Sequence, residues 1–210
     1  MNSTVRTSRL LTILAIGIGL AACNPLKPHE DPTRHYFLLF IEPEEGDLNV
    51  ELDIAIGVGP VRLIPYLKRT PIATRVGENE IEYSQIDRWA EPLDIVIPFY
   101  LASNLNYLLS PEDVEVFPWL GSKHIDYVVK VDILGFHRNA NGDAELTADW
   151  DIEDPNGRDL VSRYTYIEVP ASENTTKASV TALSDALSDF SREIAAAIQE
   201  VEATRQAEAR

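Results

Sequence analysis

Residues 143–153 read Asp-Ala-Glu-Leu-Thr-Ala-Asp-Trp-Asp-Ile-Glu, with an apolar side chain at every second position. This period of two predicts a β-strand with one buried face and one polar face. Asn141-Gly142 and Asn156-Gly157 flank the stretch, and Asn-Gly pairs favour the tight turns of β-hairpins. The region therefore predicts three antiparallel strands, over residues 126–136, 143–153 and 160–169.

Shorter strands are predicted upstream of these hairpins. The segment 35–41 is apolar on both faces, which is typical of a strand covered on both sides. The segment 52–58 alternates between apolar and polar or small residues, which is typical of a half-buried strand. Two more strands are expected over 72–76 and 80–84, on either side of a turn at Gly77.

Two segments predict amphipathic helices, because their apolar residues recur at spacings of three and four. They run over residues 91–109 and 175–205. Pro92 suits the first turn of the former, whereas Pro98 predicts a kink or a later start. Strands followed by a helix, twice over, predict an α+β fold, with a mostly antiparallel sheet and two amphipathic helices in a single domain.

The N-terminus has the features of an export signal. Arg6 and Arg9 precede an apolar run from Leu10 to Ala22, which is too short to remain as a membrane-spanning helix. Cys23 is the only cysteine of the chain, and Leu20-Ala-Ala-Cys23 resembles a bacterial lipobox. The resemblance implies that Cys23 is lipidated after the signal is cut. The alternative, a buried N-terminal helix, leaves this cysteine without a role.

These features divide the chain into four parts. Residues 1–22 are the predicted lipoprotein signal peptide, and residues 23–34 form a lipidated, proline-rich tether. Residues 35–205 are the expected folded domain, and residues 206–210 are a polar tail.

The charge of the chain excludes some classes of partner. It contains 34 acidic residues against 18 Lys and Arg, for a net charge of −16, and removal of residues 1–22 takes away Arg6 and Arg9 but no acid. Nucleic acids are excluded as partners, because their binding depends on neutralising phosphates. A domain lying flat on anionic lipid is disfavoured for the same reason.

No signature of an enzyme is present. The sequence lacks Gly-x-Ser-x-Gly, His-Glu-x-x-His, Cys-x-x-Cys and a phosphate loop, and its four histidines are scattered. The carboxylates of Asp149, Asp151 and Glu153 lie on alternate strand positions about 6.6 Å apart, which favours a solvated face over a calcium site. We expect neither a cofactor nor a metal, and no catalytic activity.

One stretch, residues 58–93, concentrates prolines, aromatic residues and cations in this acidic chain. It has two interpretations: a loop that packs its own aromatic residues under a helix end, or a contact surface, since aromatic residues and Arg dominate binding hot spots. The second interpretation makes Tyr66 and Trp89 more important for assembly than for folding. The candidate partner-binding residues are Arg62, Tyr66, Leu67, Arg69, Arg75 and Trp89.

This stretch also resembles a family signature, that of the ABC-type transport auxiliary lipoproteins of the paraquat-inducible-operon C type. The matching residues are Val61, Leu63, Pro65, Tyr66, Leu67, Arg69, Ile72 and Arg75, followed by Trp89-Ala-Glu-Pro-Leu93. Two features depart from the pattern, because Ile64 shifts the usual Leu-Pro pair by one position and Pro98 interrupts the first helix.

The resemblance implies a function without catalysis. Such a protein is a periplasmic lipoprotein subunit of an MCE/ABC-type lipid transport system that supports outer-membrane integrity, and its partner is an MCE-domain protein. Asn24, rather than Asp, follows Cys23, which implies the periplasmic face of the outer membrane rather than the inner membrane. The alternative function is a stand-alone periplasmic lipoprotein that binds lipid or a small molecule.

The same resemblance favours a homo-oligomer, and a ring in particular, because MCE proteins form symmetric rings that a lipoprotein could match. In this hypothesis the cation-rich segment 62–75 of one copy meets the acidic segment 143–153 of the next.

Overall fold

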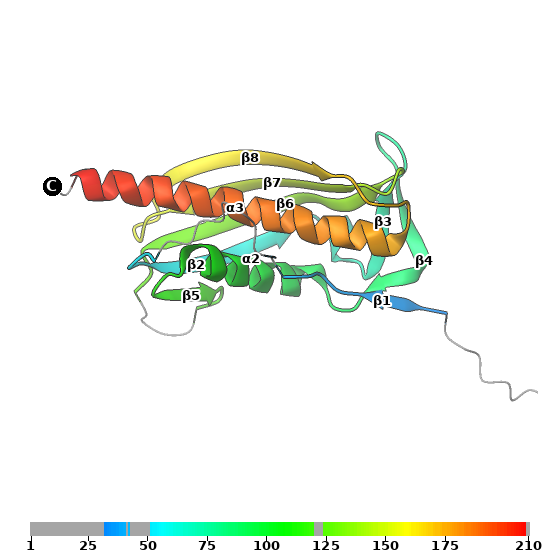
Figure 1. The fold of residues 1–210 in the computed structure, drawn as a ribbon, viewed down its shortest axis with the longest axis horizontal. Coiled ribbons are helices and arrows are strands. Elements are labelled where there is room, and N and C mark those ends of the chain that lie inside the picture. Colours follow the sequence, from blue (N-terminus) through cyan, green and yellow to red (C-terminus); the bar gives the residue numbers. More distant parts are fainter. Residues whose placement is uncertain (1–31, 41, 43–50, 120–123, 209–210) are drawn as a thin grey trace, which may run out of the picture. The chain divides into compact units, whose positions relative to one another are not determined.

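The central strand of the fold is β6 (Tyr127–Asn139), from which the rest of the sheet extends on both sides (Figure 1). The structure is a computed structural model that describes residues 32–40, 42, 51–119 and 124–208. Residues 33–210 form one compact unit. Cys23, the predicted signal peptide and the tether up to residue 31 lie outside the described residues.

One side of β6 carries the predicted hairpins. β6 pairs antiparallel with β7 (Ala144–Glu153), which pairs antiparallel with β8 (Asp159–Val169). Gly142 and Gly157 adopt positive φ angles of 100° and 78° in the two turns, a conformation that glycine adopts without strain. The three-strand prediction is therefore confirmed.

The other side of β6 divides between two strands. Its first half pairs with β2 (Ala55–Leu63), which also pairs with β5 (Asp113–Val116), and both pairings are parallel. The end of β6 pairs parallel with β3 (Pro71–Arg75). The 3-10 turn η1 (Pro65–Lys68) lies between β2 and β3.

Two further strands complete this half of the sheet. β4 (Ile81–Trp89) pairs antiparallel with β3, and β1 (Arg34–Tyr36) pairs parallel with β4. The longest ladders are antiparallel, which confirms the predicted α+β class. Among the described strands, however, four of the seven pairings are parallel, a feature that the sequence pattern did not predict.

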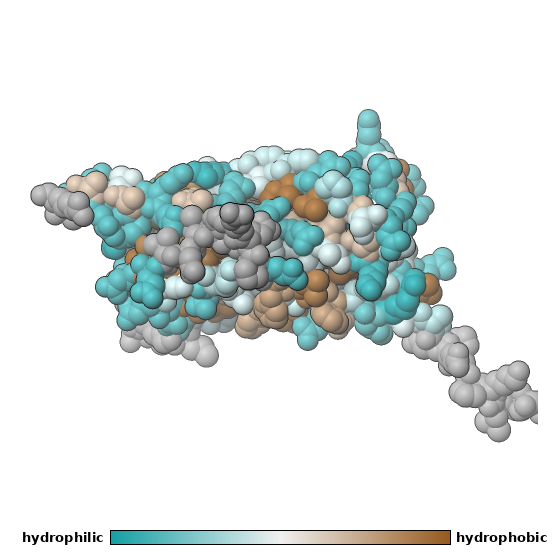
Figure 2. All heavy atoms as spheres, viewed as in Figure 1, coloured by the Kyte–Doolittle hydropathy of each residue, from teal (hydrophilic) through white to brown (hydrophobic). Residues whose placement is uncertain are grey.

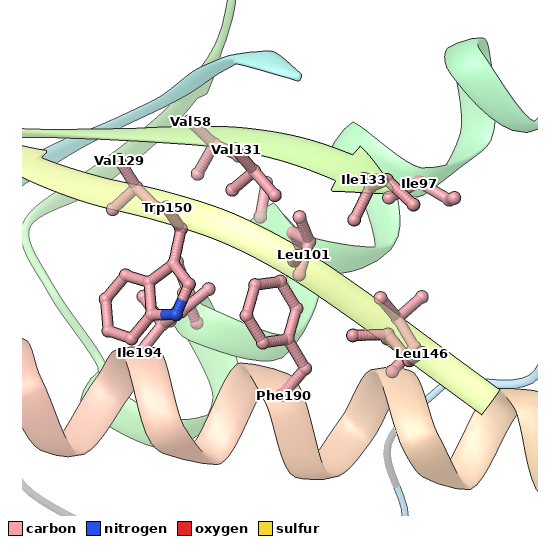
Figure 3. Close-up of a cluster of buried hydrophobic side chains, with 14 of the residues drawn as sticks. Val58, Ile97, Leu101, Val129, Val131, Ile133, Leu146, Trp150, Phe190 and Ile194 are labelled. Carbon is pink, nitrogen blue, oxygen red and sulfur yellow. The ribbon is translucent and has the colours of Figure 1, made fainter. Parts of the chain in front are cut away.

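Two helices cover the sheet: α2 (Leu93–Leu109) and α3 (Thr176–Glu208). α2 packs mainly on β2 and β5, whereas α3 packs mainly on β7 and β8 and also contacts α2. Figure 3 shows the layer between helices and sheet, where Trp150 and Leu146 of β7 meet Phe190 and Ile194 of α3. The apolar faces predicted for the hairpin strands and the two helices are the faces that form this core.

Four strands differ from the predictions, and one of them, β4, runs on to Trp89 instead of ending at residue 84. Pairing of the first strand stops at Tyr36, opposite the end of β4, so residues 37–40 leave the sheet instead of forming a covered strand. β2 begins only at Ala55, and its first five residues, 55–59, are buried on both faces, because Trp119 and Ile125 pack over Gly57. Strand β5 was not predicted.

Candidate interaction surface

The family-like segment forms a bonded cluster rather than an open loop. The Tyr66 hydroxyl lies 2.9 Å from Nδ1 of His137, and Nε2 of His137 lies 3.2 Å from Oε2 of Glu145. Arg75 of β3 donates two hydrogen bonds to the same carboxylate, at 2.5 and 2.8 Å. We call Tyr66, His137, Glu145 and Arg75 the polar cluster. Because the carboxylate accepts a hydrogen bond from Nε2–H, Nδ1 of neutral His137 accepts a hydrogen bond from the Tyr66 hydroxyl.

Burial and charge set the protonation of this cluster. Burial raises the pKa of Tyr66 to about 12 and lowers the pKa of His137, because it disfavours the charged form of each. Burial also acts to raise the pKa of Glu145, but hydrogen bonds and charge from Arg75 outweigh it and hold that pKa below its ordinary value. The cluster therefore holds a neutral histidine between a protonated tyrosine and an ionised carboxylate.

Leu67 and Trp89 hold the segment from inside. Both are buried, and Trp89, only 5% exposed, stacks on Phe136 with ring centroids 6.1 Å apart. The backbone N–H of Trp89 donates to the carbonyl of Thr70, which fixes the end of η1 against β4. These two predicted contact residues are core side chains, and we expect them to act in folding rather than as direct contacts.

Arg62, Arg69 and Arg75 have partners in the same chain. Arg62 forms a bidentate pair with Asp132 across the β2–β6 ladder, at 2.5 and 2.6 Å. Arg69 lies 4.2 Å from the centroid of the Tyr83 ring. Arg75 pairs with Glu145, which is buried although it stands on the polar side of the alternating pattern in 143–153. The contact expected between the cation-rich segment and residues 143–153 of a neighbour is thus made, at this pair, within the chain.

An exposed basic turn remains at the tip of this segment. Pro65, Lys68, Arg69 and Thr70 are exposed, while Leu67 behind them is buried. We call residues 65–70 the basic turn. Of the predicted contact residues, Arg62 and Arg69 are exposed, Tyr66 is half-buried and Arg75 is partly exposed.

A second exposed surface lies on α2 and was not predicted. The buried stripe of this helix matches the prediction, yet Ile95 and Phe99 are exposed on another face. The segment after β1 lies beside them, since Phe40 stacks on Tyr100 with centroids 4.6 Å apart. Figure 2 shows hydrophobic residues gathered over this part of the molecule. We call the exposed side chains Phe37, Leu39, Phe40, Ile95 and Phe99 the apolar patch.

The apolar patch had a sequence signal. Ile95 and Phe99 stand four residues apart, outside the stripe of Leu93, Ile97 and Leu101, so α2 is apolar on more than one face. A helix that is apolar on all sides is normally buried on all sides. This pattern therefore indicates a face that the sheet alone does not cover.

The surface also contains two hollows, of which only the second adjoins the apolar patch. A cavity of about 750 Å³ lies near the C-terminal end of α3, where the hydroxyl of buried Tyr127 donates to Glu202 at 2.7 Å. Five acidic residues line this cavity: Asp126, Asp154, Asp159, Glu200 and Glu208. Two arginines also line it, and each forms an ion pair, Arg158 with Asp154 and Arg205 with Glu202. A groove of about 810 Å³ runs between α2 and β5, beside Phe99, Phe117 and Trp119.

In the part of the chain that the structure describes, no three His, Cys, Asp or Glu side chains are grouped so that they could hold a metal ion. Nor is any helix within those ranges long and apolar enough to cross a membrane.

The family described as "ABC-type transport auxiliary lipoprotein component" matches residues 36–195, from β1 into α3. The chain belongs to this family. The match includes the polar cluster, the basic turn and the apolar patch, and it identifies the protein as an auxiliary lipoprotein of a transport system. Two members of the polar cluster, Tyr66 and Arg75, lie in the stretch 58–93 that resembles the family signature.

Two crystal structures share the fold of this auxiliary lipoprotein. Protein XCC0632 from Xanthomonas campestris, a DUF330 protein, is similar with a TM-score of 0.71 at 14% identity, covering 83% of this chain and 99% of that one. An uncharacterized protein is similar with a TM-score of 0.65 at 19% identity, covering 79% of this chain and 99% of that one. No curated protein matches the chain.

Proposed function

We propose that this chain is a non-catalytic periplasmic subunit of an MCE-type lipid transport system that supports outer-membrane integrity. The observation that carries the proposal is the match of residues 36–195 to the transport auxiliary lipoproteins. The lipobox-like sequence ending at Cys23 supports a lipid anchor, and Asn24 after it supports the outer membrane. The strongly acidic composition is consistent with a protein partner rather than a nucleic acid.

The basic turn is the surface that we propose for the MCE-domain partner. Lys68 and Arg69 are exposed cations on a chain of net charge −16, so they offer a local contrast in charge that a partner can recognise. Buried Leu67 and the bond between Tyr66 and His137 hold the turn in place beneath them. A preorganised turn loses little conformational entropy on binding.

Co-purification tests the function and the surface together. From detergent-solubilised membranes, the lipidated protein should enrich an MCE-domain protein over an unrelated lipoprotein. The double variant Lys68→Gln/Arg69→Gln should lose most of this enrichment, whereas Arg158→Gln, which removes an exposed cation from the turn before β8, should retain it. Absence of MCE enrichment with the unmodified protein would remove the main support for the proposed function.

Lipid anchoring at Cys23 is tested separately. Cys23→Ser should release the protein from the membrane fraction, since it removes the thiol to which the proposed acyl chains attach. Retention of this variant after a salt wash would contradict the anchor without bearing on the MCE partner.

We also propose a homo-oligomer, with a ring as the preferred form. Within the described sheet, β8 pairs only with β7, so its outer edge offers backbone groups to another copy. Light scattering of the chain without its signal, at low and high salt, should give a mass above that of a monomer. A monomer under every condition would contradict the self-assembled ring.

The alternative, a lipoprotein that binds lipid by itself, is favoured by one observation. The groove between α2 and β5 is large enough for part of an acyl chain and is lined by Phe99, Phe117 and Trp119. Phospholipid extracted from the purified, signal-less protein at one molecule per chain would favour this function over that of a docking subunit.

A further inference from the structure

We infer that the apolar patch docks the folded domain onto the surface of a bilayer with electrically neutral headgroups, next to the site of lipid anchoring. The inference rests on the membrane anchor proposed above. It assigns a membrane-facing side to the domain, formed by the segment after β1 and the outer face of α2.

The patch is held outward by defined contacts. Leu38 is buried, so its neighbours Phe37 and Leu39 in the extended chain are directed away from the core. The Tyr100 hydroxyl donates to the carbonyl of Leu38 at 2.6 Å, and Ser184 Oγ accepts from the N–H of Leu39 at 3.0 Å. Bonds from both helices thus fix this segment, and its exposed side chains are displayed on a structured backbone.

The exposed side chains are those found at membrane interfaces. Phe37 is 67% exposed and Phe99 59% exposed, Leu39, Phe40 and Ile95 are also exposed, and Tyr100 joins the two segments through its contacts with Phe40 and Leu38. Of the five exposed side chains, only Ile95 and Phe99 lie on α2, and the other three lie in the segment after β1. Exposed Phe, Leu and Ile side chains are those that insert into the boundary between headgroups and acyl chains. In water the same side chains would leave a structured apolar surface exposed.

The length of chain before the patch places a bilayer within reach. Nine residues, 24–32, separate Cys23 from Thr33, where the folded unit begins. Even fully extended, they span only about 35 Å. Phe37 follows four residues after Thr33, so an anchor at Cys23 keeps the patch near the membrane at high effective concentration. This proximity favours a lipid surface over a freely diffusing partner.

Charge decides which lipid surface fits. Glu91 and Asp94 are exposed at the start of α2 beside the patch, and Arg34, the cation before it, already pairs with Asp87 at 2.7 Å. The chain as a whole carries −16. Anionic lipid would repel this surface, whereas zwitterionic headgroups would not.

Vesicle flotation tests the inference without the lipid anchor. The probe is the chain from residue 24 onward; residues 33–210 form a compact unit with its own core, so it folds without the anchor. It should float with phosphatidylcholine vesicles and float less with an equal mixture of phosphatidylcholine and phosphatidylglycerol. The double variant Phe37→Ser/Phe99→Ser should bind phosphatidylcholine vesicles at least about tenfold more weakly than the unmodified chain.

The matched control removes exposed aromatic residues elsewhere. Tyr164 and Tyr166 on β8 are 64% and 51% exposed, and Tyr164→Ser/Tyr166→Ser should leave flotation unchanged. Equal melting temperatures for both double variants would show that folding is retained. No flotation with either vesicle, or equal flotation of the two variants, would overturn the inference. Because neither result involves the MCE partner or Cys23, the proposed function would stand or fall by its own experiments.

Discussion

The polar cluster beneath the basic turn and the apolar patch on α2 are built in opposite ways. The former uses residues that look functional in a sequence, namely Tyr66, His137, Glu145 and Arg75, and it bonds them to one another. The latter uses plain Phe and Ile side chains and leaves them exposed. In this protein the dense sequence motif therefore marks a segment that is held in place by its own contacts, whereas the exposed apolar patch has no such motif.

Trp89→Ala should give the largest effect that separates the two regions. Trp89 is buried on Phe136, and truncation of such an aromatic side chain costs about 3–5 kcal/mol of the free energy of unfolding. Urea unfolding followed by circular dichroism measures the loss. A loss below about 1 kcal/mol would mean that Trp89 is not a core side chain and would contradict the contrast between this segment and the apolar patch.

Arg75→Ala should come second. It removes the charged partner of the buried Glu145 carboxylate and leaves it with neutral donors, His137 among them, and the loss of one partner of a buried pair is costly. Because the Arg75 side chain is partly exposed, solvent screening reduces the expected loss to about 2 kcal/mol. The double variant Arg75→Ala/Glu145→Ala should recover part of this loss. If it instead showed two additive losses, the pair would not be coupled.

Tyr66→Phe should destabilise the protein by about 1 kcal/mol. The variant keeps the ring but removes the hydroxyl, which leaves Nδ1 of His137 without its donor. Tyr83→Phe is a suitable control, since its hydroxyl makes a longer bond, 3.2 Å, to the carbonyl of Tyr66. An effect of Tyr83→Phe as large as that of Tyr66→Phe would argue against the special role of the bond to His137.

Acidification should weaken the polar cluster. The pKa of His137 is lowered in the folded state, so the unfolded chain binds more protons and stability falls as pH drops through 6.5, the ordinary value. The groups facing His137 are Tyr66, Glu145 and Arg75; Glu145, whose pKa is also lowered, adds a further loss of stability below 4.5. Melting temperatures of the protein and of His137→Gln, measured between pH 8 and pH 5, should converge as pH falls. Parallel curves would contradict this assignment.

Phe99→Ser should have the smallest effect on stability, within about 0.5 kcal/mol, because the side chain is exposed. We expect this variant to melt like the unmodified chain yet to bind phosphatidylcholine vesicles more weakly, which would support a role of Phe99 in binding rather than in folding. A large loss of stability would instead place Phe99 in the core and remove it from the apolar patch.

Much of the candidate site could be located from the sequence, but the roles of its residues could not. The stretch 58–93 was identified from its aromatic residues and cations, and it does contain the basic turn and part of the polar cluster. The roles of Arg75 and Trp89 depend on Glu145 and Phe136, which are far away in the sequence. No local pattern connects these positions.

The strands and helices that could be predicted from the sequence are those specified by periodicity and turn residues within a short stretch of chain. The alternation in 143–153 and the Asn-Gly turns beside it specify β6, β7 and β8, and the spacing of Leu and Ile residues specifies the buried stripes of α2 and α3. Periodicity and turn chemistry act over a few residues, so these elements could be predicted with nearly their final boundaries.

Three features depend on tertiary contacts and could not be predicted from the sequence. They are the parallel pairings of β2, β3 and β1, the early end of β1, and the exposure of the apolar patch. A parallel ladder joins strands that are distant in sequence, so no turn residue encodes it. An apolar strand or helix face likewise does not specify whether another element will cover it. Residues 37–40 and the outer face of α2 both carry apolar side chains that remain exposed. Residues 37–40 are exposed because the pairing of β1 ends at Tyr36, and the outer face of α2 is exposed because the opposite face of this helix is the one packed in the core.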